Sequence, residues 1–240
     1  MKARIKFRKY GVMKFIGHLD VMRFFQKVMR RADIPIAFTQ GFSPHMIMSF
    51  AQPLGVGVTS DGEYFDIELK ESISSVKAVE QMNKAMVEGM EVVSFVEIPD
   101  DKKCSGMTIV AAAEYAVSLL ESGKTSDITC EITDAWKEKI TEFMAQPEIR
   151  ILKQTKRSEK EVDIKPMIYD MEVCDNKVCM FLATGSEQNL KPDLVMKAFL
   201  TFAGEPLDTP LHYHRVEVYA KNPENPCEYI SLEELGKEIV

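Results

Sequence analysis

Alternating and helical patterns of apolar residues predict the elements of residues 1–100. Residues 3–9 alternate between apolar and basic side chains, which predicts a strand with one wet, basic face. Residues 18–32 place apolar side chains on one arc of a helical wheel, and Pro35 ends that pattern. Further on, the pattern predicts strands at 36–38, 46–50, 63–69 and 90–98, a turn at 60–62 and a helix at 74–86. Apart from the short strand at 36–38, this half follows the order β-α-β-β-α-β.

The same order recurs in residues 107–222. Apolar runs predict strands at 107–120, 148–154, 162–173, 178–183 and 216–220, with helices at 134–144 and 191–203. Asp175 and Asn176 fit a two-residue hairpin turn. We therefore predict an α+β protein of two ferredoxin-like β-α-β-β-α-β halves with antiparallel sheets. The acidic residues 223–240 are predicted to form a C-terminal tail or a peripheral helix.

Composition narrows the class of protein. The 240 residues are 45% hydrophobic and 28% charged, as in an ordinary globular protein. No apolar stretch approaches the roughly 20 residues of a membrane span, and the N-terminus lacks the apolar core of a signal peptide. We therefore expect a cytoplasmic protein with no membrane partner. The five cysteines are an odd number at irregular spacing, which favours reduced thiols over a disulfide framework.

Positive charge is concentrated at the N-terminal end of the chain. Residues 1–60 hold ten Lys and Arg against two acidic residues, a local charge of +8. The whole chain has a formal charge of −7, so residues 61–240 carry −15. Charge of this kind governs long-range attraction to a partner rather than the fold. We therefore look for the binding surface in the first sixty residues.

Two sets of basic residues are the candidates for binding phosphate. The first is on the predicted strand and the second on the outer arc of the following helix: Arg4, Lys6 and Arg8, then Arg23, Lys27, Arg30 and Arg31. Such a stripe is often only a solvated helix face. Here Asp20 is the one acidic residue that interleaves with it, which favours RNA phosphate as the ligand.

The loop at residues 39–45 supplies the candidate base-binding groups. Gly41 can adopt a positive φ, and Pro44 holds the chain extended before it. The side chains that such a loop can present are Gln40, Phe42 and His45. Exposed aromatic rings beside basic residues are typical of proteins that bind single-stranded RNA. The alternative is that Phe42 packs into the core beneath the loop.

A catalytic or metal site in the same region is the alternative to RNA binding. His18, Asp20 and His45 could form an acid–base group or bind a metal, whereas His18 and Asp20 could equally serve the helix N-terminus. A catalytic, metal or nucleotide site here requires that His18, Asp20, Gln40, Phe42 and His45 lie within reach of one another, and we predict that they do. Cys174 and Cys179 flank the predicted turn, where a labile disulfide is possible but a structural role is favoured.

A resemblance adds a partner. The segments at 15–20, 30–32, 40–45, 49–51, 53–57, 63–69 and 162–166 resemble the radical-SAM-linked domain family of unknown function. The motif residues of that family correspond here to His18, Asp20, Arg31, Gln40, Gly41, Phe42, Pro44 and His45. Many members have Ser at the position of Gly17 and Asn at that of Ser43. The resemblance implies a radical-SAM protein as partner, and it implies no activity.

Three functional hypotheses follow. The leading one is a non-enzymatic RNA-binding accessory module that acts with a radical-SAM enzyme, for instance in tRNA or rRNA modification. The second is a protein–protein adaptor whose basic surface docks on that enzyme. The third is an RNA-modifying or RNA-cleaving enzyme that uses His18, Asp20 and His45. We expect no cofactor and no bound metal, because the chain lacks the motifs that hold them.

Overall fold

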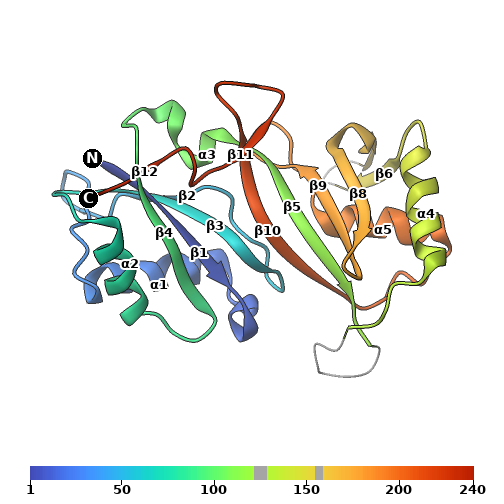
Figure 1. Ribbon diagram of the computed structural model, residues 1–240, viewed down its shortest axis with the longest axis horizontal. Coiled ribbons are helices and arrows are strands. Elements are labelled where there is room, and N and C mark those ends of the chain that lie inside the picture. The colour runs from blue at the N-terminus through green and yellow to red at the C-terminus, as the bar shows by residue number, and fades with distance from the viewer. Residues whose placement is uncertain (122–128, 155–158) are drawn as a thin grey trace. The chain divides into compact units, whose positions relative to one another are not determined.

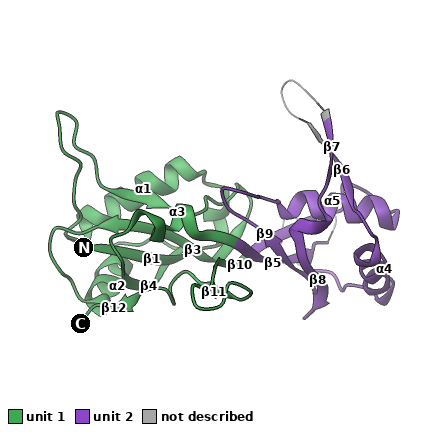
Figure 2. Cartoon of the chain, turned by 90° about the horizontal axis from the view of Figure 1, so that it is seen from above, with its two compact units in different colours: residues 1–111, 215–240 green, residues 112–214 purple. Residues whose placement is uncertain are grey.

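Two units, each with its own buried residues, make up the chain. The computed structural model describes residues 1–121, 129–154 and 159–240, with side chains omitted at 153, 154 and 159. Unit 1 comprises residues 1–111 and 215–240, and unit 2 comprises residues 112–214 (Figure 2). Within the described ranges, no helix is long and apolar enough to cross a membrane. The protein is a mixed α+β structure whose sheets are mostly antiparallel.

Unit 1 is an antiparallel sheet with two longer helices. Its elements are β1 (Lys2–Lys9), the 3-10 helix η1 (Gly11–Phe15), α1 (His18–Arg31), β2 (Met48–Phe50), β3 (Thr59–Glu68), α2 (Ser75–Lys84), β4 (Met90–Ile98), the 3-10 helix η2 (Lys102–Cys104), α3 (Gly106–Ile109), the later part of β10 (Leu211–Lys221), β11 (Tyr229–Ser231) and β12 (Lys237–Glu238). The strands lie in the order β12-β4-β1-β3-β10, and β2 also pairs with β3. Ile5 of β1 lies opposite Phe65 on one side and Phe95 on the other.

The core of unit 1 lies between the sheet and the helices α1 and α2, which share one face of the sheet (Figure 1). The alternation predicted for β1 places Phe7 on this face, where its ring contacts Phe25 of α1 at 4.6 Å. Phe50 and Phe65 complete the aromatic cluster, with ring centroids 5.1 Å apart. Burial of such large rings stabilises the fold by about 1.5–3 kcal/mol each. The apolar residues that recur with helical periodicity in residues 18–32 are therefore those that α1 buries in this core.

The opposite face of the sheet is covered as well, which corrects the prediction of a wet, basic face on β1. Residues 102–109 and the C-terminal segment 229–239 pack over it. Arg4 is only 1% exposed, and its guanidinium donates to both carboxylate oxygens of Asp66, at 2.8 and 3.0 Å. It also donates to the carbonyls of Cys104 and Leu232. The basic residue at this position is therefore internal.

The C-terminal segment differs from the predicted tail or peripheral helix. Residues 223–240 include β11 and β12, and they group with unit 1. Leu232 is fully buried, and Ser75 exchanges hydrogen bonds with Ile239, at 2.9 Å from its N–H and 2.8 Å to its hydroxyl. Edge pairing of so short a strand depends on a partner distant in sequence, so the local pattern does not reveal it.

Two predicted boundaries are wrong for identifiable reasons. The turn predicted at residues 60–62 lies inside β3, where Gly62 allows a close approach of β10: a Cβ there would lie 2.7 Å from the Cα of Glu217. The single strand predicted at 162–173 is broken at Lys165–Met167, a 3-10 helix that contains Pro166. Proline lacks the N–H that a continuous strand needs.

Unit 2 repeats the alternation of strands and helices. It contains β5 (Val110–Leu119), α4 (Asp134–Ala145), β6 (Arg150–Gln154), β7 (Glu159–Asp163), β8 (Ile168–Cys174), β9 (Lys177–Ala183) and α5 (Pro192–Ala203). β9 pairs antiparallel with both β5 and β8, while β6 and β7 form a separate hairpin. Trp136 and Phe143 of α4 pack edge-on against Phe199 of α5. The helices thus bury the apolar faces that their periodicity predicts.

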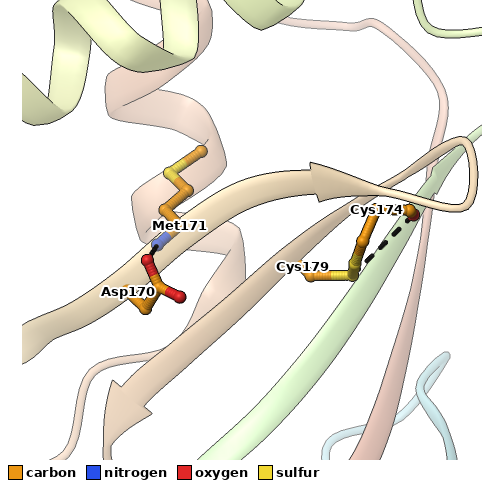
Figure 3. Close-up of a disulfide and its surroundings, with 4 residues drawn as sticks. All are labelled: Asp170, Met171, Cys174 and Cys179. Atoms are coloured by element: carbon orange, nitrogen blue, oxygen red, sulfur yellow. Dashed lines mark hydrogen bonds between the residues drawn. A yellow bond between two sulfur atoms is a disulfide. The ribbon is translucent and has the colours of Figure 1, made fainter.

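The hairpin between β8 and β9 confirms the predicted two-residue turn. Asp175 and Asn176 have φ values of 47° and 61°, as a type I′ turn requires. Cys174 and Cys179 lie on the neighbouring strands (Figure 3) and form a disulfide, with 6.1 Å between their Cα atoms. The expectation of reduced thiols is wrong for this pair, because the hairpin brings the two cysteines together on one face.

Removal of Arg4 tests the role of the buried pair. Arg4→Met leaves the Asp66 carboxylate buried without its cation, so we expect a loss of about 3–5 kcal/mol in the free energy of unfolding. The double variant R4M/D66L removes both charges and should recover part of that loss. The measurement is urea unfolding followed by far-UV circular dichroism.

The matched control is Arg8→Met on the same strand. Arg8 is half-exposed and lies 3.3 Å from Asp61 and 3.4 Å from Glu91. Exposed pairs contribute at most about 1 kcal/mol. Equal destabilisation by the two substitutions would contradict a special role for Arg4.

Candidate nucleic-acid interface

The three residues of β1 that were predicted to bind phosphate, Arg4, Lys6 and Arg8, all have acidic partners. Arg4 is buried against Asp66, as described above. The Lys6 ammonium lies between Glu217 at 2.6 Å and Glu233 at 2.5 Å. Burial lowers the pKa of Lys6, but hydrogen bonds to these two carboxylates outweigh it, so the pKa is raised. Burial also raises the pKa of Glu217, and Lys6 opposes that shift. Arg4 and Lys6 therefore have no surface available for phosphate.

The outer face of α1 keeps its charge on the surface. Arg23, Lys27, Arg30 and Arg31 are all exposed. Arg23 has Asp20 as a neighbour one turn away, at 3.4 Å. Among the residues that the structure describes, no ion pair is formed by Lys27, Arg30 or Arg31. These cations near the helix C-terminus also complement its dipole, and they remain available to an anionic ligand.

The loop at residues 39–45 is the tip of a short hairpin. Phe38 and Met46 form an antiparallel bridge at its base. Thr39 and His45 close the tip: the Thr39 N–H donates to the His45 carbonyl at 2.9 Å, and the His45 N–H donates to the Thr39 hydroxyl at 3.1 Å. Gly41 adopts φ +111°, the conformation for which glycine was expected. The hairpin therefore has a defined shape without any contact to the core at its tip.

Phe42 is fully exposed at the end of this hairpin, with a relative exposure of 111%. The alternative that its ring closes the core beneath the loop is wrong. Gln40 and His45 beside it are exposed as well. An exposed phenyl ring gives up the roughly 1.5–3 kcal/mol that burial would provide. Its placement on a closed turn is typical of a side chain that contacts a ligand.

The predicted convergence of His18 with the hairpin is wrong. His18 packs edge-on against Phe50 at 5.1 Å and lines a small cavity together with Glu63. The hairpin is anchored beyond the other end of β3, where Ile36 bridges to Leu69. His18 is also the first residue of α1, whereas the hairpin follows Arg31 at its other end, about 20 Å further along the helix. His18 and Asp20 therefore do not meet Gln40, Phe42 and His45.

This separation removes the geometric basis of the catalytic alternative. An acid–base pair or a metal site needs its side chains within a few ångströms of one another. In the part of the chain that the structure describes, no group of three or more His, Cys, Asp or Glu side chains is placed to hold a metal. What remains of the predicted site is an interface of cations and exposed rings.

A buried lysine, which was not among the predicted site residues, lies at the end of β1. Lys9 is only 2% exposed, and its ammonium donates to the Ile16 carbonyl at 3.1 Å. Burial lowers its pKa; the Glu63 carboxylate opposes this shift and Arg215 adds to it. The signal was present, because Lys9 falls on the same side of the alternating strand as Phe7. The adjoining cavity of about 10 Å³ has room for about one water molecule.

Unit 2 carries the larger hollow, of about 1050 Å³, beside α5 and the strand β6. Its charged lining is mixed: Glu148, Arg150, Glu187, Lys191, Asp193 and Lys197. Arg150 is already engaged by Glu148 and Glu161. A lining with equal numbers of acidic and basic groups favours neither an anionic nor a cationic ligand.

Comparison with known proteins gives a family and distant structural similarity to solved chains, of which 25 match. The model of the family described as "Uncharacterized protein conserved in bacteria (DUF2344)" matches residues 2–192. No curated protein matches the chain. A solved structure described as "Crystal Structure of a Cbf5-Nop10-Gar1 Complex" is similar with a TM-score of 0.43 and 12% identity. That alignment covers 90% of this chain and 48% of the other, so this chain spans about half its length.

The lowered pKa of Lys9 predicts a pH-dependent stability. The unfolded chain titrates this lysine near 10.5, and the folded protein releases the proton at lower pH. Between these values the unfolded state binds more protons, so the free energy of unfolding rises with pH. We expect the wild type to gain stability relative to Lys9→Met as pH increases from 7 toward 10.5, by at most about 1.4 kcal/mol per pH unit.

Urea unfolding of both proteins at several pH values measures this difference. Lys77→Met is the control, because it removes an exposed lysine from α2. If the difference in free energy of unfolding between wild type and K9M did not change with pH, as is expected for K77M, the pKa of Lys9 would not be lowered in the folded protein.

Proposed function

The chain belongs to the family described as "Uncharacterized protein conserved in bacteria (DUF2344)", and because that description assigns no activity, we propose a function from the surface of unit 1. The protein is a non-enzymatic module that binds single-stranded RNA in the cytoplasm. The cations on the outer face of α1 bind phosphates, and Phe42 stacks on a base. Gln40 and His45 flank that ring as hydrogen-bonding groups.

The observation that carries this proposal is Phe42. A ring that is fully exposed on a hairpin closed by Thr39 and His45 is held ready for a planar partner. Stacking on an unpaired base suits such a ring, since every base offers a flat face. Base pairing in a duplex hides those faces, which is why the proposed ligand is single-stranded.

The distribution of charge supports a nucleic acid as the partner. The chain as a whole is acidic, with a formal charge of −7, so it has no general attraction for polyanions. Lys27, Arg30 and Arg31 are nevertheless exposed together on α1, the helix that precedes the hairpin. Local positive charge on an acidic protein directs an anionic ligand to one surface.

The fold favours the helix side for this role. The order β4-β1-β3-β2 in unit 1 supports the predicted ferredoxin-like half, and β9 between β5 and β8 supports a second. RNA-binding modules with a four-stranded sheet commonly use the open face of that sheet. In unit 1 the corresponding face is covered by residues 102–109 and the C-terminal segment. The helix side and the hairpin are thus the surfaces left for RNA.

The partner in this proposal is a radical-SAM enzyme, on the resemblance of residues 15–69 to the radical-SAM-linked family. The module would present tRNA or rRNA to that enzyme. The adaptor hypothesis assigns the same cations to an acidic patch on the enzyme. Nuclease treatment separates the two: a complex that survives it, and is lost in R23E/K27E while RNA binding persists, favours the adaptor.

Salt dependence is the primary test of RNA binding. Four phosphate contacts, from Arg23, Lys27, Arg30 and Arg31, give an expected slope of about −2.8 for log affinity against log salt concentration. R30Q/R31Q should reduce that slope to about −1.4, because two contacts are removed. The measurement is fluorescence anisotropy of a labelled 12-nucleotide single-stranded RNA between 50 and 200 mM KCl.

The matched control is K77Q/K102Q, which removes two exposed lysines elsewhere in unit 1. It should leave the slope near the wild-type value. Affinity that does not change with salt, or an equal effect of the two double substitutions, would remove the proposal.

A further inference from the structure

The exposed side chains of α1 form one continuous stripe. Leu19, Arg23, Lys27 and Arg30 follow one another at spacings of four, four and three residues, and Arg31 lies beside the last of them. Residues at these spacings lie on one face of a helix. All five are exposed, while Val21, Phe25 and Val28 face the core. The stripe thus extends over the whole length of the helix.

The N-terminal end of the stripe is apolar. Leu19 is 60% exposed, and Phe15, at the end of η1, is 65% exposed. Lys14 places its ammonium over the Phe15 ring at 5.4 Å. The loop with exposed Val56 is tied to the same place, since the Gly57 N–H donates to the Lys14 carbonyl at 2.7 Å. This end therefore offers an aromatic ring on an apolar surface with a cation beside it.

The C-terminal end of the stripe leads to the second exposed ring. After Arg31 the chain turns at Asp33 and enters the hairpin that carries Phe42. The cations between the two ends are Arg23, Lys27, Arg30 and Arg31, and Arg23 pairs with Asp20, while the other three form no ion pair with any residue that the structure describes. The order along the chain is thus ring, cations, ring.

We propose that this stripe is a linear track for single-stranded RNA, with a base-stacking site at each end: Phe15 with Leu19 at one, and Phe42 at the other. This inference rests on the proposed function and gives it a length and an architecture. From Leu19 to Arg31 the helix rises about 18 Å. Stacked nucleotides rise about 3.4 Å each, so the stripe from Leu19 to Arg31 spans about five nucleotides. A base beyond each end brings the full site to about seven.

The proposed track selects RNA that is unpaired, and it has little preference for the base sequence. The cations contact phosphates, which are the same in every sequence. The two rings stack on bases, and stacking tolerates any base. Asp20, exposed beside the stripe near its apolar end, repels phosphate there, so the first base is held through its ring rather than through its phosphate.

A length series of oligouridines tests the track. Affinity should rise from three nucleotides to about seven and then level off. On a 10-nucleotide oligouridine, Phe15→Ala and Phe42→Ala should each weaken binding about 5- to 150-fold. A trinucleotide reaches one end at a time and can use either end, so each single variant should lose less affinity for it than for the 10-nucleotide RNA, and the double variant F15A/F42A should lose more than either single variant. Val76→Ala, at an equally exposed apolar site on α2, is the control.

The possible outcomes distinguish failure of the track from failure of the proposed RNA-binding function. Absence of RNA binding by the wild type at low salt overturns both. Binding that responds to R30Q/R31Q but not to F15A, or that is equal for three and ten nucleotides, overturns the track and leaves the proposed function standing. Equal affinity for a blunt RNA duplex overturns both, because both require an unpaired base. Thermal unfolding of each variant confirms that the exposed substitutions leave the fold intact.

Discussion

The buried pair of Arg4 and Asp66 is the contact on which unit 1 depends. It joins β1 to β3, and the same guanidinium reaches the carbonyls of Cys104 and Leu232. One side chain therefore ties together four segments that are far apart in the sequence. A charge can be buried in this way only when its donors find acceptors, and four hydrogen bonds meet that need.

The other buried cations of unit 1 also have acceptors for their donors, and the cations without such partners remain at the surface. On the covered face Lys6 lies between Glu217 and Glu233, whereas on the helix side of the sheet, near Lys9, Arg215 pairs with Glu63 in a second buried contact. The acidic C-terminal segment thus supplies internal partners for a basic strand instead of forming a free tail. Because that segment closes one face of unit 1, the predicted phosphate-binding residues that remain fully exposed are those of α1.

The aromatic residues of unit 1 divide in the same way. Phe7, Phe25, Phe50 and Phe65 pack against one another in the core. Phe15 and Phe42 are exposed at the two ends of α1, each on a short element whose backbone is fixed by hydrogen bonds. Cations and rings that do not pack in the core therefore occur on α1 and on the segments that flank it, and this is the basis of the proposed RNA-binding surface.

Hydrophobic periodicity was sufficient for most elements, because the core selects apolar residues every second or every third to fourth position. It predicted α1, α2 and β4. The residue types found in turns predicted the hairpin turn at Asp175 and the positive φ of Gly41. The pattern could not tell which charged residues are buried. Arg4 depends on partners 62 and 228 residues away, and Arg215 on one 152 residues away. Lys9 is the exception, because the alternation already places it on the core side of its strand, whereas His18 and the hairpin lie at opposite ends of α1. Pairing across such distances is a property of the folded chain, and local sequence carries no record of it.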